Sequence, residues 1–330
     1  IQPEKAIEYM TKSFEGGDFD AARLLVKMLR EGKYVPKNET RAFEIVSQAA
    51  DRGNVEAQHF MGDLYESGAG IDKDLAKARD AYTTAAEAGL AQSQNKLGLI
   101  YGQGQEGLEP DLAKSEGWFQ KAADQGFAPA HLNLALLIDR KGSPTSEDSS
   151  KASAHLITAA GAGMPEAQDR LGAWYRDGRH VQKDLVAASS WFKPAANAGN
   201  LNSKINLAQL LEITAQEAEA IKTALQLYID AGNAGHPVAH FHIARMLLSG
   251  RLGLIDPVPA YAHLAASAEA GLAISQEALP KLKVNLNEEQ MAKGEELKAQ
   301  IRVVKIQASG DGSAASETTT AAPVAQPAVE

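Results

Sequence analysis

Large apolar side chains recur along this chain at spacings of four residues, and each run begins with a small residue. Three such runs are Ala57, Met61 and Tyr65; Ser93, Leu97 and Tyr101; and Ala167, Leu171 and Tyr175. Because 3.6 residues make one helical turn, side chains spaced by four and eight residues lie on one face of a helix. The pattern therefore predicts a series of amphipathic helices, which we call helices A.

A second apolar stripe precedes each helix A and predicts a partner, helix B. One example runs through Leu75, Ala78, Tyr82 and Ala85-Ala86 and stops before Gly89. This glycine recurs along the chain, and we call the set the landmark glycines: Gly17, Gly53, Gly89, Gly126, Gly163, Gly199, Gly235 and Gly271. Successive landmarks lie 36 or 37 residues apart. A period this regular predicts a repeat array, and each repeat takes the name of its landmark.

Each landmark glycine is expected to end helix B in a left-handed conformation, which glycine adopts at the lowest cost. Nine residues after a landmark stands another small residue in most repeats, such as Gly62, Gly98 and Gly172. Small residues at fixed places let two helices approach closely, while leucines and aromatic residues fill the space beside them. An ordinary alanine-rich helical bundle is the alternative, but it has no reason to keep a register of 36 residues.

The stretch from Ala57 to Gly89 resembles a Sel1-like repeat, a relative of the tetratricopeptide repeat with a slightly longer period. The resemblance rests on Met61-Gly62, Tyr65, Gly68-Ala69-Gly70, Asp74, Ala78, Tyr82 and Ala85-Ala86. It extends over roughly residues 3–284, with departures at residues 141–148 and 212–215. It implies an all-α fold, a right-handed superhelical solenoid of antiparallel helix pairs with a period of about 36 residues.

Three segments are expected along the chain. Residues 1–284 form the Sel1-like array of about seven repeats, entered in the middle of a repeat because Pro3 begins the first turn of a helix B. Pro280 is expected to kink or stop the last helix A. Residues 285–307 form a polar capping helix that starts with a capping box at Asn287. Residues 308–330, rich in Ala, Thr and Pro, are expected to be disordered.

Charge and composition exclude several classes of function. The net charge is −9, which argues against binding to nucleic acid or to an anionic membrane surface. No apolar run approaches the length needed to span a bilayer. The chain has no cysteine, so it contains no disulfide, thiolate nucleophile or thiolate metal site, unlike a disulfide-rich branch of Sel1-like proteins. Cysteine content does not decide between an oxidising and a reducing compartment.

Two groups of residues carry possible chemistry, and no catalytic residue and no cofactor site is predicted. His236, His240 and His242 are a candidate metal site, although the third points away from the first two, and a hydrogen-bonded polar row is the favoured interpretation. Trp118 and Trp191 share one register and are interpreted as packing residues of helix B, with a sugar-stacking platform as the alternative. Glycine-rich stretches lack the preceding strand and the Lys-Ser or Lys-Thr end of a phosphate loop.

The candidate binding site follows from the resemblance, because helix A lines the concave side of tetratricopeptide-type arrays. Its positions are three, six, ten and thirteen residues after each landmark, and we call them the helix A surface. The predicted partner-binding residues are Glu56, His59, Asp63, Asn95, Leu99, Leu132, Leu136, Asp139, Asp169, Arg176, Ile205, Gln209, Phe241 and Arg245. Exposed apolar side chains among them would indicate a partner. Burial between neighbouring repeats is the other interpretation.

The sequence thus predicts a non-enzymatic scaffold or adaptor that binds a protein partner, whether peptide, helix or folded subunit, through its concave surface. Sel1-like proteins generally serve as assembly and regulatory adaptors, many of them in bacterial envelopes. The expected location is therefore the periplasm or cell envelope, with the cytoplasm as the alternative. The competing hypothesis is an enzyme, or a carbohydrate-binding or metal-dependent module, built on the tryptophans or on the His236, His240 and His242 group.

Overall fold

A computed structural model describes residues 3–15, 19–140, 144–214 and 217–306 of the 330-residue chain. Within those ranges the chain forms 17 α-helices and no strand, and one isolated β-bridge joins Gln105 to Leu108. The chain divides into two compact units, residues 1–195 and 196–330. The predicted all-α class is therefore confirmed, and one period of the sequence corresponds to one pair of helices.

The helices alternate as the sequence predicts. Helices B are α1 (Pro3–Glu15), α3 (Glu39–Asp51), α5 (Leu75–Glu87), α7 (Leu112–Ala123), α9 (Ser146–Gly161), α11 (Leu185–Asn197), α13 (Ala218–Asn233) and α15 (Pro257–Glu269). Helices A are α2 (Phe19–Glu31), α4 (Val55–Ser67), α6 (Ala91–Gln103), α8 (Ala128–Asp139), α10 (Pro165–Asp177), α12 (Leu201–Thr214), α14 (Pro237–Leu248) and α16 (Ala273–Lys283). A last helix, α17 (Glu288–Lys298), follows them.

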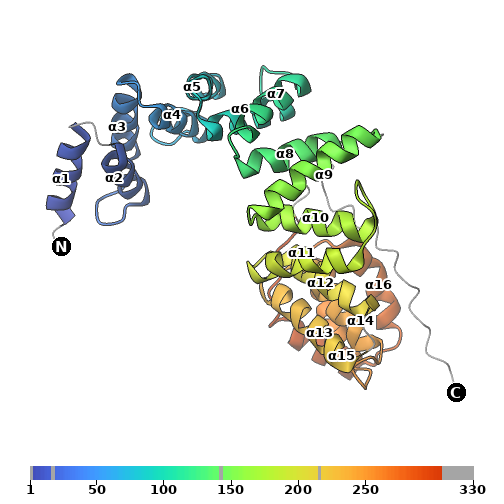
Figure 1. The fold of residues 1–330 in the computed structure, drawn as a ribbon. Coiled ribbons are helices and arrows are strands. Elements are labelled where there is room, and N and C mark those ends of the chain that lie inside the picture. The colour runs from blue at the N-terminus through green and yellow to red at the C-terminus, as the bar shows by residue number, and fades with distance from the viewer. Residues whose placement is uncertain (1–2, 16–18, 141–143, 215–216, 307–330) are drawn as a thin grey trace. The chain divides into compact units, whose positions relative to one another are not determined.

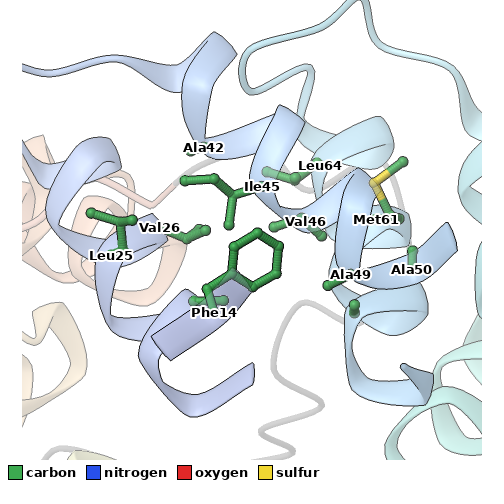
Figure 2. Close-up of a cluster of buried hydrophobic side chains, with 12 residues drawn as sticks. Phe14, Leu25, Val26, Ala42, Ile45, Val46, Ala49, Ala50, Met61 and Leu64 are labelled. Atoms are coloured by element: carbon green, nitrogen blue, oxygen red, sulfur yellow. The ribbon is translucent and has the colours of Figure 1, made fainter. Parts of the chain in front are cut away.

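Packing joins neighbours in the sequence. In the first unit each helix from α1 to α10 contacts the next, and in the second unit the same holds from α12 to α16, with α17 resting on α15 (Figure 1). Buried side chains form separate clusters, each shared by a few consecutive helices. Figure 2 shows the first cluster, in which Phe14 of α1 meets side chains of α2 and α3. Neither unit is built around one central core.

The helices have modest lengths. None in the described ranges combines the length and the apolar character that a membrane span requires.

The landmark glycines end helices B as predicted. Seven of them have φ between 76° and 97°, while Gly17 lies outside the described residues. The amide that follows the landmark donates to the carbonyl five residues earlier, from Leu90 to Ala85 at 3.0 Å and from His236 to Ala231 at 3.1 Å. These bonds satisfy carbonyls that the helix end would otherwise leave unpaired. Each turn thus reverses the chain in a few residues.

The small residues nine positions after a landmark make room for a large side chain of the next helix B. A Cβ added to the glycine would lie 2.4 Å from the Tyr82 ring at Gly62, 2.4 Å from the Phe119 ring at Gly98 and 2.6 Å from the Phe192 ring at Gly172. Real Cβ atoms essentially never lie this close to another atom. The sequence predicts that these small residues let two helices approach closely. The structure shows that the space above each glycine is filled by an aromatic ring of the next helix B and not by its backbone.

The size of the small residue follows the size of the side chain that occupies the same register of the next helix B. Alanine replaces glycine where that side chain is leucine, in the pairs Ala135–Leu156 and Ala244–Leu264. In the first cluster both positions hold valine, Val26 and Val46. Ala208 with Tyr228 departs from this rule. Most junctions are thus matched in volume, as close packing of interiors requires.

The C-terminal part differs from the prediction in extent. Asn287 and Gln290 form the predicted capping box, and α17 packs on α15, where Gly294 admits the Tyr261 ring. The helix nevertheless ends at Lys298, so the predicted helix to residue 307 is wrong. Residues 301–306 form no helix, and two of their amides bond to landmark turns instead: Val304 N–H donates to the Gly235 carbonyl (2.9 Å) and Ile306 N–H to the Ala270 carbonyl (2.8 Å).

Two other predictions concern the ends of the array. Helix α16 contains Pro280 and continues to Lys283, so this proline does not stop the helix. The segment 308–330, predicted to be disordered, lies outside the described residues.

The ring-and-glycine fit predicts the effect of one methyl group. Gly98→Ala is expected to lower the free energy of unfolding by about 1–3 kcal/mol, because the new methyl overlaps the Phe119 ring. Gly117→Ala is the matched control, since Gly117 lies inside α7 and a Cβ there would meet no atom within 4 Å, so we expect a gain of up to about 1 kcal/mol. Thermal and urea unfolding measure both effects.

Adding Phe119→Leu to Gly98→Ala imitates the Ala–Leu junctions and should recover part of the loss. A Gly98→Ala variant as stable as its control would refute the fit.

Candidate functional site

The helix A surface carries polar side chains that bond to the neighbouring repeat. Three contacts join successive helices A of the first unit: His59 Nδ1 with Ser93 Oγ at 2.9 Å, Lys96 Nζ with Glu66 Oε2 at 2.8 Å, and Asn133 Nδ2 with Asn95 Oδ1 at 2.8 Å. In the second unit Gln209 Nε2 lies 2.9 Å from His242 Nε2. Much of the predicted site therefore serves to hold repeats together.

A tyrosine anchors the carboxylates of this surface in the Gly53 repeat. The Tyr82 hydroxyl lies 2.7 Å from Asp63 Oδ1 and 2.9 Å from Glu66 Oε2. Burial, and then these two acceptors, raise the pKa of the Tyr82 hydroxyl, so it stays a donor. Burial alone would raise the pKa of the Glu66 carboxyl, but the bonds from Lys96 and Tyr82 outweigh it and the pKa is lowered. Burial lowers the pKa of His59.

The second unit repeats this arrangement with a more deeply buried carboxylate. Glu212 is 7% exposed, and its Oε2 accepts from the Tyr228 hydroxyl at 2.9 Å and from the Arg245 guanidinium. Burial, followed by the Glu212 charge, raises the pKa of Tyr228. The Tyr228 ring stacks on His242 with centroids 4.9 Å apart. Burial, and then the Arg245 charge, lower the pKa of His242 to about 3. The imidazole is therefore neutral at physiological pH.

The structure also shows a contact chain that sequence reasoning missed. His180 Nε2 lies 2.7 Å from Asp139 Oδ1, and its Nδ1 lies 3.1 Å from Ser149 Oγ. This order of groups is that of a hydrolytic triad, but the His180 side chain is 2% exposed and packs against the tilted Trp174 ring, which leaves a substrate no access to it. We interpret it as a clamp between α8, α9 and the turn after α10. The sequence offered one signal, a histidine in the register that holds Gly70 in the Gly53 repeat, and the structure gives His180 a positive φ of 59° there.

The predicted site residues fall into three groups. Those held by a side-chain hydrogen bond or ion pair are His59, Asp63, Asn95, Asp139, Arg176, Gln209 and Arg245. Those that pack at the edge of an apolar cluster are Leu99, Leu132 and Phe241. Outside these clusters lie the exposed Glu56 and the half-buried Leu136 and Asp169, of which Asp169 is also engaged in an interaction.

One predicted site residue is wrong. Ile205 is 1% exposed and belongs to the core shared by α12, α13 and α14, so it offers nothing to a partner. Burial between neighbouring repeats, the alternative interpretation, holds at this position.

The histidine group does not converge on one point. His236 contacts Asn202, His240 contacts His263, and His242 contacts Gln209. Within the described ranges no three His, Cys, Asp or Glu side chains are placed to hold a metal ion. The tryptophans pack as predicted: Trp118 and Trp191 are partly buried against apolar clusters. Lys121 Nζ lies 4.0 Å from the centre of the Trp118 ring, on the face that a sugar would need.

Comparison with known proteins now identifies the repeat. The Sel1 repeat family matches residues 2–18, 20–54, 55–90, 91–127 and 165–200. The chain contains five Sel1 repeats. No curated protein sequence matches it. The landmarks extend the Sel1 pattern into residues 128–164 and 201–271, which the family does not match but which form the same helix pairs.

Solved structures share the fold of this Sel1-repeat chain. A protective antigen of uropathogenic Escherichia coli with an SLR fold is 24% identical with a TM-score of 0.77, over 89% of this chain and 63% of that one. The chain thus spans less than two thirds of the length of that protein. A Sel1 repeat protein from Oxalobacter formigenes is 25% identical with a TM-score of 0.57, over 70% of this chain and 96% of that one.

The Glu212–Arg245 pair gives a test of the inter-repeat contacts. Arg245→Met is expected to lower the free energy of unfolding by about 1–3 kcal/mol, because Glu212 stays buried with one partner fewer. Arg41→Met is the control: Arg41 pairs with Glu44 on the surface, so we expect less than about 0.5 kcal/mol. In a double-mutant cycle with Glu212→Gln the two changes should be coupled by about 1 kcal/mol. Strictly additive losses would contradict the contact.

Proposed function

We propose that this Sel1-repeat chain is a non-enzymatic scaffold or adaptor that binds a protein partner through its helix A surface. Sel1 and related tetratricopeptide-like repeats generally act as scaffolds for protein–protein interaction. One observation of this chain carries the proposal: polar side chains at the repeat junctions, such as Tyr82 and Tyr228, are engaged in inter-repeat bonds, while helix A keeps a strip of exposed and half-buried groups beside them. Such a strip suits recognition of a protein surface.

In the first unit the strip combines acidic and apolar groups. Glu56 is exposed in the first turn of α4, and the Asp63 side chain is 41% exposed about two turns further along the same face. Leu136 is half-buried in α8, in the same register as Asp63. A partner with basic residues beside an apolar side chain would complement these groups. This combination favours a peptide or helix over a nucleic acid, whose phosphates acidic groups would repel.

In the second unit the strip is formed by α12 and α14. Phe241 packs at the edge of the cluster of α14, α15 and α17 and keeps part of its ring accessible. Arg245 pairs with Glu212 yet keeps 43% of its side chain exposed. The arginine therefore supplies a basic contact point, where the same register holds Asp63 and Leu136 in the first unit. Each unit is proposed to bind through its own strip.

We further propose that the adaptor works in assembly or regulation of a bacterial envelope complex, in the periplasm or at the cell envelope. Support comes from the usual role of Sel1-like proteins and from the Ala-, Thr- and Pro-rich composition of residues 308–330. Fractionation of cells that express the tagged chain tests the location, and recovery in the cytoplasm alone would contradict it. The metal and carbohydrate alternatives gain no support, because the histidines have separate partners and a lysine covers the Trp118 ring.

Site-specific photo-crosslinking tests the proposed surface. A photoreactive amino acid placed at position 56 or 136 on helix A should crosslink the full chain to one defined protein in cells. The matched control is position 186 on helix B, where Val186 is 81% exposed and outside the proposed surface. Leu136→Asp should abolish crosslinking from position 56 while the circular dichroism spectrum stays helical. Equal crosslinking from position 186, or capture that survives Leu136→Asp, would reject the assignment.

A further inference from the structure

Two histidine pairs occupy one and the same slot in the two units. The slot is formed by the fifth residue after a landmark, on helix A, and the eighth residue before the next landmark, on helix B. His131 of α8 and His155 of α9 fill it in the first unit, with their Nδ1 atoms 2.9 Å apart. His240 of α14 and His263 of α15 fill it in the second, with their Nδ1 atoms 3.0 Å apart. Four of the eight histidines are thus used in two identical contacts.

The fold does not require histidine in this slot. In two other repeats of the first unit the same two positions hold Gln94 with Trp118, and Gln168 with Trp191. There the glutamine amide donates to a carbonyl of its own landmark turn, at 3.0 Å for Gln94 and 3.2 Å for Gln168. These residues do not titrate. The junctions therefore form equally well with groups that are insensitive to pH.

The hydrogen-bond partners define the protonation state of the second pair. His240 Nε2 faces the Arg302 carbonyl at 3.2 Å, and a carbonyl only accepts, so this nitrogen carries a proton. In a neutral ring the Nδ1 of His240 is then an acceptor, and His263 Nδ1–H donates to it. A further proton on this acceptor would place two N–H groups face to face at 3.0 Å. The hydrogen bond would then be lost, and once both rings are protonated the contact would become a repulsion between two cations.

We propose that the two histidine pairs are acid-sensitive latches, which hold α8 to α9 and α14 to α15 when neutral and release these junctions when protonated. The device is independent of the proposed partner. Its consequence is that acidification loosens two defined junctions of the array and leaves the Gln–Trp junctions closed.

The surroundings of the first pair moderate its response. Burial and the neighbouring His131 lower the pKa of His155, while the carboxylates of Asp124 and Glu116, both from α7 and its C-terminal end, act in the opposite direction. The charged groups that face this pair thus come from α7, and they favour the protonated form. The first latch is expected to open at a higher pH than the second.

The second pair has no carboxylate that opposes burial. Burial lowers the pKa of His240, and burial together with His240 lowers the pKa of His263 to about 4. The other groups that face it are His236 at the start of α14 and the backbone carbonyls of Arg302 and of Gly232 in α13, and both carbonyls favour the protonated form of His240. An unfolded histidine has a pKa of about 6.5. Because the folded values are lower, the unfolded state binds more protons, and stability falls as the pH drops from about 6.5 towards 4.

The loss-of-function test replaces a latch by the residues that the chain uses elsewhere. The unfolding constant of the native chain is expected to rise on the order of tenfold more between pH 7.5 and pH 5 than that of His240→Gln/His263→Trp. His131→Gln/His155→Trp is expected to remove a smaller part of the response. If tryptophan does not fit at position 263, the double variant His240→Gln/His263→Leu takes its place. Leucine suits this position because Leu227 occupies the same position in the Gly235 repeat. An unchanged pH response in these variants would overturn the proposal.

The gain-of-function test moves the latch to a junction that lacks it. Gln94→His/Trp118→His should add acid sensitivity to α6 and α7, seen as faster hydrogen exchange of their amides at pH 5 relative to the native chain. Gln94→His alone is the control and should add a smaller sensitivity, since the single imidazole is buried but has no facing imidazole. On the native chain, NMR titration of the His263 ring should show a midpoint well below 6.5, and a midpoint at or above about 6.5 would also overturn the proposal.

Discussion

The array depends on one steric fit, a large side chain of helix B seated in the gap above a small residue of the preceding helix A. Tyr82 over Gly62, Phe119 over Gly98 and Phe192 over Gly172 leave no space for even one methyl group. Since the two residues come from consecutive repeats, the fit fixes the register of each repeat against the next. The left-handed turn at each landmark glycine then reverses the chain, so that the next helix A is placed to make the same fit.

This local constraint explains how the polar groups are used. A helix pair that contacts only its neighbours has little interior, and the edges of each junction remain close to solvent. Tyr82 and Tyr228 place their rings in the junction and their hydroxyls at its edge, where carboxylates of the helix A surface accept from them. The surface that the resemblance assigns to a partner is therefore also the surface that locks the repeats, and partner binding and junction stability share residues.

The repeated parts of the fold could be predicted from the sequence, because each repeat confirms the others. Helix order, the left-handed glycines and the capping box at Asn287 all follow from local pattern. Three features could not be predicted, because they depend on neighbours distant in sequence. Ile205 is buried by α13 and α14, α17 is followed by a non-helical segment that bonds to Gly235, and His180 joins Asp139 to Ser149. A period of 36 residues identifies equivalent positions but does not fix what faces each of them.

Native-state hydrogen exchange of a Gly62→Ala variant tests the central claim most directly, because it reports the stability of every helix separately. If each junction is held by its own ring-and-glycine fit, exchange should accelerate in α4, α5 and the helices next to them, and the amides of α12 to α17 should keep the rates of the native chain. A uniform acceleration across all helices would show that the chain is held by a shared core, and would contradict the account.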